Sequence, residues 1–104
     1  MKTFDELVEL IHSWAHERGL SRRQHAEKQM LKVVEEIGEL SAGLARKDKE
    51  AITDAIGDVL VTIIILSNQL GIDPVKSLNE VYDVINKRTG KTVNGVFIKD
   101  GDQK

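Results

Sequence analysis

Apolar residues recur along most of the chain at the three- and four-residue spacing of an α-helix, and this pattern predicts four helices. The first helix opens at Thr3, because Thr3 and Glu6 have the spacing of a capping box, and it ends near Gly19. The second helix begins within residues 22–26 and runs to about residue 45. Its apolar stripe consists of Met30, Val33, Ile37, Leu40 and Leu44.

The third predicted helix covers residues 49–70 and ends at Gly71. Its run Val-Leu-Val-Thr-Ile-Ile-Ile-Leu is also typical of a buried strand, but the helical spacing continues upstream to Ile52, which favours a helix. Asp73 and Pro74 are the residue types of an N-cap and a first helical position, so they open the fourth helix.

The fourth helix ends in the run Asn86-Lys87-Arg88, shortly before Gly90. The tail that follows contains Asn94-Gly95 between apolar residues, which is a turn signal with short flanks. We therefore expect a tail that is either irregular or hairpin-like.

The third helix is apolar around most of its circumference. Its main stripe is Ile52, Ile56, Val59, Ile63, Leu66 and Leu70, and its other side carries Val61, Ile64 and Ile65. A helix of this kind is buried on more than one side. In so small a domain the second covering surface would be another subunit. The sequence thus predicts one all-α domain over residues 1–104, a four-helix bundle completed by oligomerisation.

The composition narrows the function classes. The net charge is −2 with 31% charged residues, which weighs against a dedicated nucleic-acid binder. A nucleic-acid-associated protein would have to show binding with a steep salt dependence. The longest apolar run, Val59–Leu66, is far shorter than the roughly 20 residues of a membrane-spanning helix. With no cysteine and no signal-peptide pattern, we expect a cytoplasmic protein without membrane or nucleic-acid partners.

Two groups of acidic residues carry the candidate chemistry. Glu35, Glu36 and Glu39 lie in the second predicted helix, and Asp54 and Asp58 lie in the third. Carboxylates three or four residues apart share one face of a helix. Antiparallel helices joined by a short turn pack about 8–10 Å apart, so the two acidic faces can surround one small volume. Hard oxygen ligands in this arrangement favour Mg²⁺, with Mn²⁺ as a substitute, and such an ion usually meets phosphate.

A solvated helix face is the plain alternative for such acidic residues. Against it, Glu36 borders the apolar stripe, and Asp58 lies beside Gly57 and directly precedes the most apolar stretch of the chain. A buried acid is costly unless it has a basic partner or a bound cation. We interpret the pattern as a cation site.

Basic residues form the second candidate set. Lys28 and Lys32 lie one helical turn apart upstream of the glutamates, and Lys87 and Arg88 end the fourth helix. Such side chains are commonly solvated, but some of these could neutralise the outer phosphates of a bound nucleotide. Spacing does not distinguish which of them do so.

Neutral residues around Trp14 in the first helix are the candidates for a base pocket. Two histidines of the same helix, His12 and His16, lie one turn apart, a spacing that permits a metal site. We interpret the pair as part of the surface of a weakly amphipathic helix.

The ordered set of motifs resembles the MazG-like all-α nucleoside triphosphate pyrophosphohydrolases. The motifs are Lys28-Gln29-x-x-Lys32, Glu35-Glu36-x-x-Glu39, Gly57-Asp58, Asn86-Lys87-Arg88 and the tail from Lys91 to Lys99. The similarity spans most of the chain. It implies Mg²⁺-dependent hydrolysis of a nucleoside triphosphate between the α and β phosphates, giving a nucleoside monophosphate and pyrophosphate.

The resemblance also implies roles for individual residues. Glu36, Glu39 and Asp58 match metal ligands, and Glu35 matches an acid that holds or activates water. Small members of the family are dimers or tetramers with sites built at subunit contacts. Phosphoribosyl-ATP pyrophosphohydrolases are close relatives, so that narrower activity is an alternative.

One position departs from the family pattern. Where an E-x-x-D motif is expected, the chain has Ala55 three residues before Asp58, and Asp54 stands one residue further back. Asp54 either takes over the role of metal ligand or supports the metal ligands without binding the ion itself. A second class of function also stays open, in which the chain is a helical dimerisation or adaptor module whose acids pair with Lys28, Lys32 or Arg88.

Overall fold

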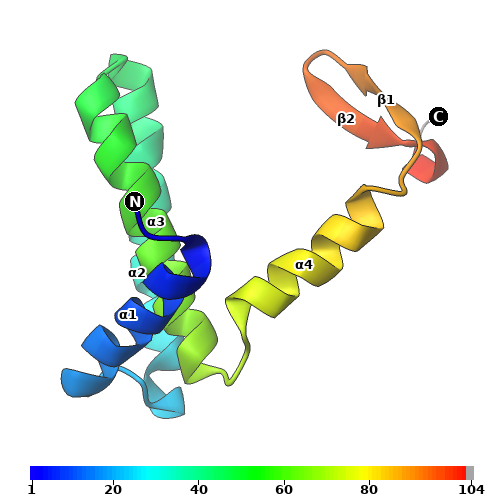
Figure 1. Ribbon diagram of the computed structural model, residues 1–104. Coiled ribbons are helices and arrows are strands. Elements are labelled where there is room, and N and C mark those ends of the chain that lie inside the picture. Colours follow the sequence, from blue (N-terminus) through cyan, green and yellow to red (C-terminus); the bar gives the residue numbers. More distant parts are fainter. Residues whose placement is uncertain (103–104) are drawn as a thin grey trace.

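The computed structural model describes residues 1–102, which form four α-helices and one β-hairpin (Figure 1). In chain order the elements are α1 (Phe4–Glu17), the short 3-10 helix η1 (Arg23–His25), α2 (Ala26–Arg46), α3 (Lys49–Gln69), α4 (Pro74–Ile85), β1 (Gly90–Val93), β2 (Val96–Lys99) and the 3-10 helix η2 (Asp100–Asp102). The predicted all-α fold with four helices is confirmed, and the apolar run considered as a strand lies inside α3.

Capping residues fix the helix ends where the sequence predicts them. The Thr3 hydroxyl accepts a hydrogen bond from the Glu6 amide at 3.2 Å, and the Glu6 carboxylate accepts one from the Thr3 amide at 3.3 Å. Asp73 caps α4 by accepting from the amides of Val75 and Lys76. Each such cap satisfies amide groups that have no partner within the helix.

Helices α2 and α3 form a long antiparallel hairpin joined by two residues. Lys47 adopts the left-handed conformation with φ of 56°, and Asp48 caps α3. Half-buried or buried residues at alternating three- and four-residue spacing make the seam between the helices. The seam consists of Gln29, Val33, Glu36, Leu40 and Gly43 from α2, with Ile52, Ala55, Val59 and Thr62 from α3.

The apolar stripe predicted for α2 is therefore only partly correct. Val33 and Leu40 lie in the seam, but Met30, Ile37 and Leu44 are 46%, 48% and 58% exposed. Polar Gln29 and Glu36 occupy seam positions instead, and the Gln29 side-chain amide donates to the Thr62 carbonyl at 3.1 Å. A stripe of apolar residues marks a buried face only if a second surface covers it.

Helix α1 packs across the C-terminal half of α3. Val8 and Ala15 of α1 and Ile64 and Ile65 of α3 are buried there. The Gln69 side-chain amide donates to the Leu20 carbonyl at 2.7 Å and ties the end of α1 to α3.

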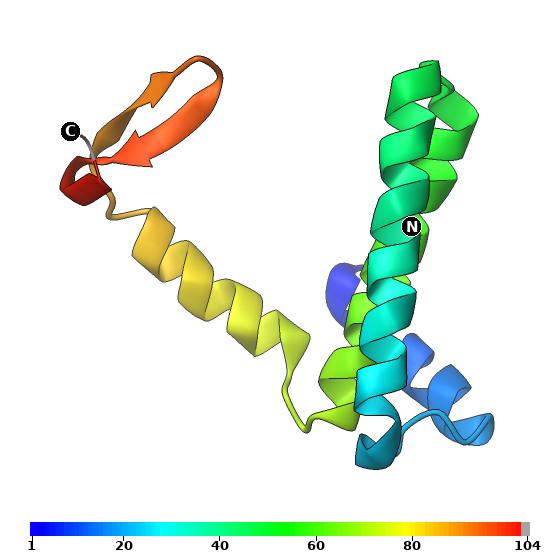
Figure 2. The same ribbon diagram turned by 180° about the vertical axis from the view of Figure 1, so that it is seen from behind.

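Helix α4 turns away from the α2–α3 hairpin and carries the β-hairpin at its far end (Figure 1, Figure 2). β1 and β2 pair antiparallel, with Val93 opposite Val96. The turn residues Asn94 and Gly95 have φ of 51° and 80°, as a two-residue hairpin turn of type I′ requires. The tail is thus hairpin-like, one of the two forms that the sequence predicts.

This arrangement leaves the chain extended. Its radius of gyration is 16.4 Å, whereas a compact domain of this length has about 13 Å. Its exposed surface is 8125 Å², against about 5,800 Å² for a compact monomer of this mass. Of the described helices, none is by itself both long and apolar enough to cross a membrane. Helices α3 and α4 reach that length and composition as a pair, bent by 106° at the break between them.

Candidate metal and nucleotide site on the α2–α3 hairpin

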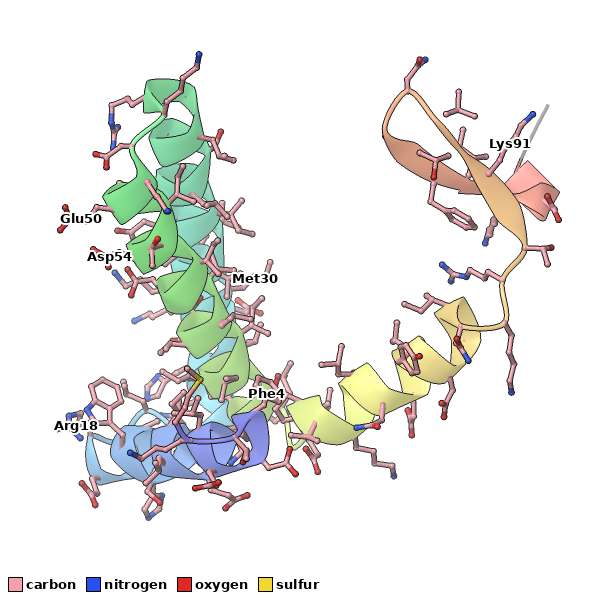
Figure 3. The ribbon with its side chains drawn as sticks, turned by 45° about the horizontal axis from the view of Figure 1, so that its top comes forward. Phe4, Arg18, Met30, Glu50, Asp54 and Lys91 are labelled. Carbon is pink, nitrogen blue, oxygen red and sulfur yellow. The ribbon has the colours of Figure 1, made fainter. Side chains whose placement is uncertain are left out.

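The acidic residues of α2 and α3 share one flank of the hairpin. An α-helix turns by about 100° per residue. Measured around the axis of its own helix from the middle of the seam, Glu39 lies at roughly 80° and Asp58 lies at roughly 70°, and both angles have the same rotational sense. Because the two helices are antiparallel, equal rotations in the same sense bring both residues to the same side. Asp54 lies further round on this flank, next to Glu50, and both project to one side of the hairpin in Figure 3. We call this side the acidic flank.

Glu36 occupies the seam itself, near a small residue of α3. Counting seven residues along each helix brings Glu36 level with Ala55 from the Gln29–Thr62 hydrogen bond, and level with Val59 from the close approach of Gly43 to Ile52, so Glu36 meets α3 between these two residues. Ala55 is 4% exposed, and Glu36 is half-buried. The family pattern has a glutamate where this chain has Ala55, so the departure removes a carboxylate that would lie near Glu36 in the seam.

Glu35 has a basic partner on its own helix. The Lys32 ammonium lies 3.1 Å from the Glu35 carboxylate, and each side chain is 57% exposed. The hydrogen bond and charge of Glu35, with a smaller effect from the charge of Glu36, raise the pKa of Lys32 above its ordinary value. Lys32 therefore stays charged at neutral pH and places one positive charge beside the acids.

Within residues 1–102, the other acids of the predicted site have no such partner. Among the described residues, no ion pair or side-chain hydrogen bond holds Glu36, Glu39, Asp54 or Asp58. The expectation that Asp58 is buried is wrong for the single chain, because its side chain is exposed. The buried residues of the apolar stretch that follows Asp58 lie on the faces of α3 that α1 and α2 cover. Asp58 lies on neither of these faces.

The donor chemistry of the acidic flank fits Mg²⁺. Within residues 1–102, no three of the acids converge closely enough to hold an ion in their present side-chain positions. Mg²⁺ usually keeps several waters and takes one or two carboxylates together with substrate phosphates, so a closed ring of protein ligands is not required. Exposed carboxylates on one flank are free to turn toward a common ion.

The structure separates the candidate phosphate ligands into two groups. Lys28 and Lys32 lie on the acidic flank, next to the glutamates. Lys87 and Arg88 lie at the far end of α4, which points away from the α2–α3 hairpin (Figure 1). One chain therefore brings only the first pair to the acids.

Trp14, the candidate for base stacking, already has a neighbour on one face. The Arg18 guanidinium lies 4.3 Å from the centre of the indole ring, and Arg18 also donates to the Trp14 carbonyl at 2.9 Å. Trp14 is 46% exposed. A base stacked on it would therefore use the opposite face or displace Arg18.

Sequence reasoning missed the position of Glu36 in the seam between α2 and α3. The signal was present in the seven-residue spacing of Gln29, Glu36 and Gly43, which alternates with Val33 and Leu40 as in an antiparallel coiled coil. Because polar residues and glycine occupy these positions, the spacing of apolar residues alone does not reveal the seam.

A sequence profile of the MazG-like family matches residues 21–94. The chain belongs to the MazG-like family. The matched region contains α2, α3, α4 and the first strand of the β-hairpin, with every acidic residue of the predicted site. It supports a protein of the nucleotide pyrophosphohydrolase type.

One curated relative of this MazG-like chain is an uncharacterised 18.2 kDa protein from the rep–hol intergenic region of Haemophilus phage HP1 (strain HP1c1). The two are 39% identical over 75 residues, which cover 72% of this chain and 46% of the relative. The chain thus spans about half the length of the relative that it matches. No solved structure matches it.

Proposed function

We propose that this MazG-like chain is a Mg²⁺-dependent pyrophosphohydrolase of ribo- or deoxyribonucleoside triphosphates. The products would be the nucleoside monophosphate and pyrophosphate. The observation that supports the proposal is the acidic flank, where Glu39, Asp54 and Asp58 lie on the same side as the seam residue Glu36, and none of the four pairs with a basic side chain within residues 1–102. Unpaired acids on one surface repel each other, and a divalent cation removes that repulsion.

Glu36, Glu39 and Asp58 would hold Mg²⁺ or Mn²⁺, and Asp54 would replace the carboxylate that Ala55 lacks. The ion would neutralise phosphate charge and increase the acidity of a bound water. Glu36 is the best fixed of these ligands because it is held in the seam between two packed helices. The others extend from the exposed flank and complete the site from its open side.

Glu35 would accept a proton from the attacking water. The water oxygen would bond to the α-phosphorus as the bond from that phosphorus to the α,β-bridging oxygen breaks, and pyrophosphate would leave. Before nucleotide binds, Lys32 pairs with Glu35. A bound triphosphate would draw Lys32 to its own oxygens, with Lys28, and so free Glu35 to take the proton.

The proposal includes a homodimer or homotetramer. The flank opposite the acids carries exposed apolar side chains, namely Met30, Val34, Ile37 and Leu44 of α2 with Ile56, Leu60 and Ile63 of α3. Helix α4 exposes Leu78, Val81, Tyr82 and Ile85. A contiguous apolar surface of this kind marks an interface. A second copy would cover it and would bring Lys87 and Arg88 to the acids of its neighbour.

The test is a product analysis. The protein is incubated with nucleoside and deoxynucleoside triphosphates and with phosphoribosyl-ATP, in Mg²⁺ or in chelator, and pyrophosphate is separated from orthophosphate. We expect Mg²⁺-dependent pyrophosphate and monophosphate. Activity confined to phosphoribosyl-ATP would assign the narrower alternative. Glu36→Gln with Glu39→Gln should abolish the products, while Glu27→Gln, on the outer face of α2, should keep them.

The Lys32–Glu35 ion pair supports a second candidate, the helical dimerisation or adaptor module. In that function the acids pair with basic residues and hold no metal. It predicts a folded protein that releases neither pyrophosphate nor orthophosphate and gains no stability from Mg²⁺. That combination of results would overturn the enzyme proposal.

A further inference from the structure

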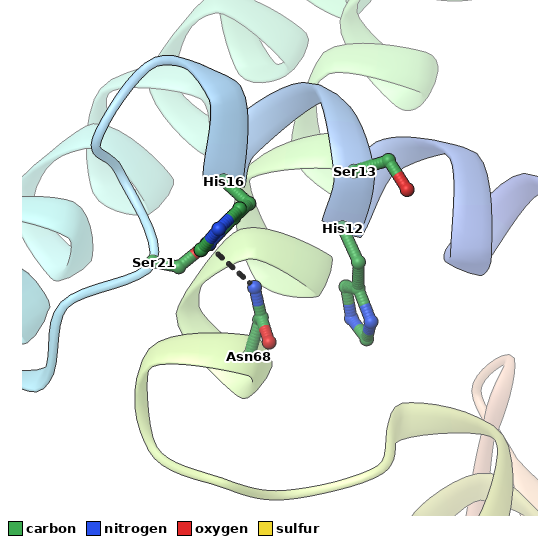
Figure 4. Close-up of a pocket in the computed structure, with 5 residues that line it drawn as sticks. All are labelled: His12, Ser13, His16, Ser21 and Asn68. Atoms are coloured by element: carbon green, nitrogen blue, oxygen red, sulfur yellow. Dashed lines mark hydrogen bonds between the residues drawn. The ribbon is translucent and has the colours of Figure 1, made fainter.

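A second cluster of polar side chains borders a cavity at the opposite end of α3 from the α2–α3 turn (Figure 4). The cavity has a volume of about 290 Å³ and opens to solvent, and its lining residues are His12, Ser13, His16, Ser21 and Asn68. His12 and His16 were expected on a free helix surface. Instead both border the cavity, where α1 meets the end of α3.

The polar atoms of this cavity are only partly satisfied. The Asn68 amide nitrogen donates to the Ser21 hydroxyl at 3.0 Å, which leaves the amide oxygen as an acceptor on the His12 side of the cavity (Figure 4). The His12 Nε2 atom is buried and has no hydrogen-bond partner among the described residues. Buried polar atoms without partners are uncommon, and an unpaired imidazole nitrogen is a metal ligand when deprotonated.

The chemistry of the lining favours a cation over an anion. None of the residues that line the cavity is a lysine, an arginine or an acid. His16 and Asn68 lie in the last turns of α1 and α3, and the carbonyl end of a helix carries partial negative charge. Imidazole with an amide oxygen suits Zn²⁺, Co²⁺, Ni²⁺ or Cu²⁺, whereas Mg²⁺ prefers oxygen ligands alone.

We propose that His12 and His16 bind a divalent transition-metal ion in this cavity. Two histidines four residues apart on one helix face can ligate a single ion. The Asn68 oxygen is the third protein ligand, and water fills the remaining positions. Because the described residues offer no group of three histidine or acidic ligands, the site is open and exchangeable, unlike the closed four-ligand sites of structural zinc.

This site is separate from the acidic flank. Asn68 follows Asp58 by ten residues, which is about 15 Å along a helix. The ligands come from α1 and α3, so the ion would tie α1 to the end of α3, next to the Gln69–Leu20 hydrogen bond. Binding would therefore stabilise the docking of α1 and leave the proposed Mg²⁺ ligands unchanged.

The test uses the full chain, stripped with chelator and then dialysed. Zn²⁺ is titrated by calorimetry and Co²⁺ by its visible absorption, both in excess Mg²⁺ so that the acidic flank does not contribute. We expect one ion per chain. His12→Gln and His16→Gln should each weaken binding at least tenfold, and Asn68→Ala should weaken it by about tenfold, as loss of a supporting ligand does.

His25→Gln is the matched control, because His25 lies in η1 and outside the cavity. It should bind as the unaltered protein does, and circular dichroism should show that all variants are folded. The proposal would be overturned if the His12→Gln/His16→Gln double variant bound Zn²⁺ and Co²⁺ as tightly as the unaltered protein does. It would also be overturned by the absence of binding by the folded unaltered protein, or by one ion per two chains, which would indicate a site between copies.

Discussion

At the scale of single residues, Ala55 is a small residue on the α3 side of the seam, near Glu36 of α2. Ala55 is buried in the seam, and Glu36 of α2 is half-buried in the same seam. A second glutamate at this position would restore the family pattern and set two carboxylates against each other. The stability of the α2–α3 hairpin would then depend on a cation.

Ala55→Glu tests this relationship. Without metal, crowding in the packed seam should lower the free energy of unfolding by roughly 1–3 kcal/mol, with charge repulsion adding to the loss. Mg²⁺ should recover much of that loss and bind more tightly than to the unaltered protein. Urea unfolding with and without Mg²⁺ measures both effects. Ala55→Gln, which adds the same volume without charge, is the control, and Mg²⁺ should stabilise it no more than it stabilises the unaltered protein.

Lys32→Met tests the ion pair with Glu35. Since Lys32 supplies a positive charge beside the acids, its removal should strengthen Mg²⁺ binding to the free protein several-fold at low salt and less at high salt. Nucleotide binding should weaken. Lys76→Met on α4 is the control and should leave both affinities unchanged. Unaltered Mg²⁺ affinity in Lys32→Met at low salt would contradict a metal site on this flank.

The same ion pair has a defined pH dependence. The pKa of Lys32 is raised above 10.5 in the folded chain, first by the hydrogen bond to Glu35 and then by its charge. A raised pKa means that the stabilising interaction is complete at neutral pH and is lost as pH rises above that ordinary value. We expect the difference in free energy of unfolding between the unaltered protein and Lys32→Met to be constant near pH 7 and to vanish in strong alkali.

The types of the site residues could be predicted from the sequence, but their surroundings could not. Helical spacing predicted two groups of acids, and the resemblance predicted metal-ligand roles for Glu36, Glu39 and Asp58, which the structure places in or beside the seam between α2 and α3. Burial of Asp58 was inferred from its apolar neighbours in sequence, yet neighbours along a helix point in different directions. The Arg18–Trp14 stack was equally invisible, because it depends on the rotamers of both side chains.

At the scale of elements, caps and turn residues located the helix ends well. Thr3, Asp73 and Gly71 act locally, so their effects do not depend on the rest of the fold. The direction in which a helix faces was harder to predict. The seam of α2 includes a glutamine, a glutamate and a glycine, while several of its large apolar residues are exposed. Periodicity identifies candidate faces, and the partner surface determines which face is covered.

Asp73→Ala tests how much one cap contributes to α4. The carboxylate accepts hydrogen bonds from Val75 and Lys76, so its loss should destabilise α4 by about 1 kcal/mol, within the usual range of 0.5–2 kcal/mol. Hydrogen exchange of the first-turn amides should accelerate accordingly. Asp83→Ala, at an exposed position of the same helix, is the control. Equal exchange in both variants would show that packing against another copy holds the helix start.

At the scale of the whole molecule, the exposed apolar flank and the extended α4 predict an assembly. Sedimentation should give a dimer or tetramer, because a stable interface buries about 800 Å² per partner or more. The chain exposes more than that amount beyond a compact monomer. Ile37→Asp should shift the protein toward monomer, since it places a charge on the apolar flank. Leu31→Asp, on the outer face of α2, is the matched control, and a monomeric unaltered protein would contradict the proposal.

Mixed assemblies test whether copies share a site. A Glu36→Gln/Glu39→Gln chain lacks the acids, and a Lys87→Gln/Arg88→Gln chain lacks the basic end of α4. Each should be inactive alone. When the two variants are mixed and their subunits exchange, the mixture should regain about a quarter to a half of the activity of the unaltered protein. The reason is that some sites then combine intact acids from one chain with an intact α4 from the other. No recovery after verified subunit exchange would show that one copy supplies both sets.

The acids and the exposed apolar residues lie on opposite sides of the same two helices. Copies joined through their apolar sides would turn their acidic sides outward, away from the symmetry axis, where only the extended α4 of a neighbour would reach them. Substrate would then diffuse to each catalytic centre from bulk solution without parting the subunits. Enlarging the oligomer would multiply the centres without burying any of them.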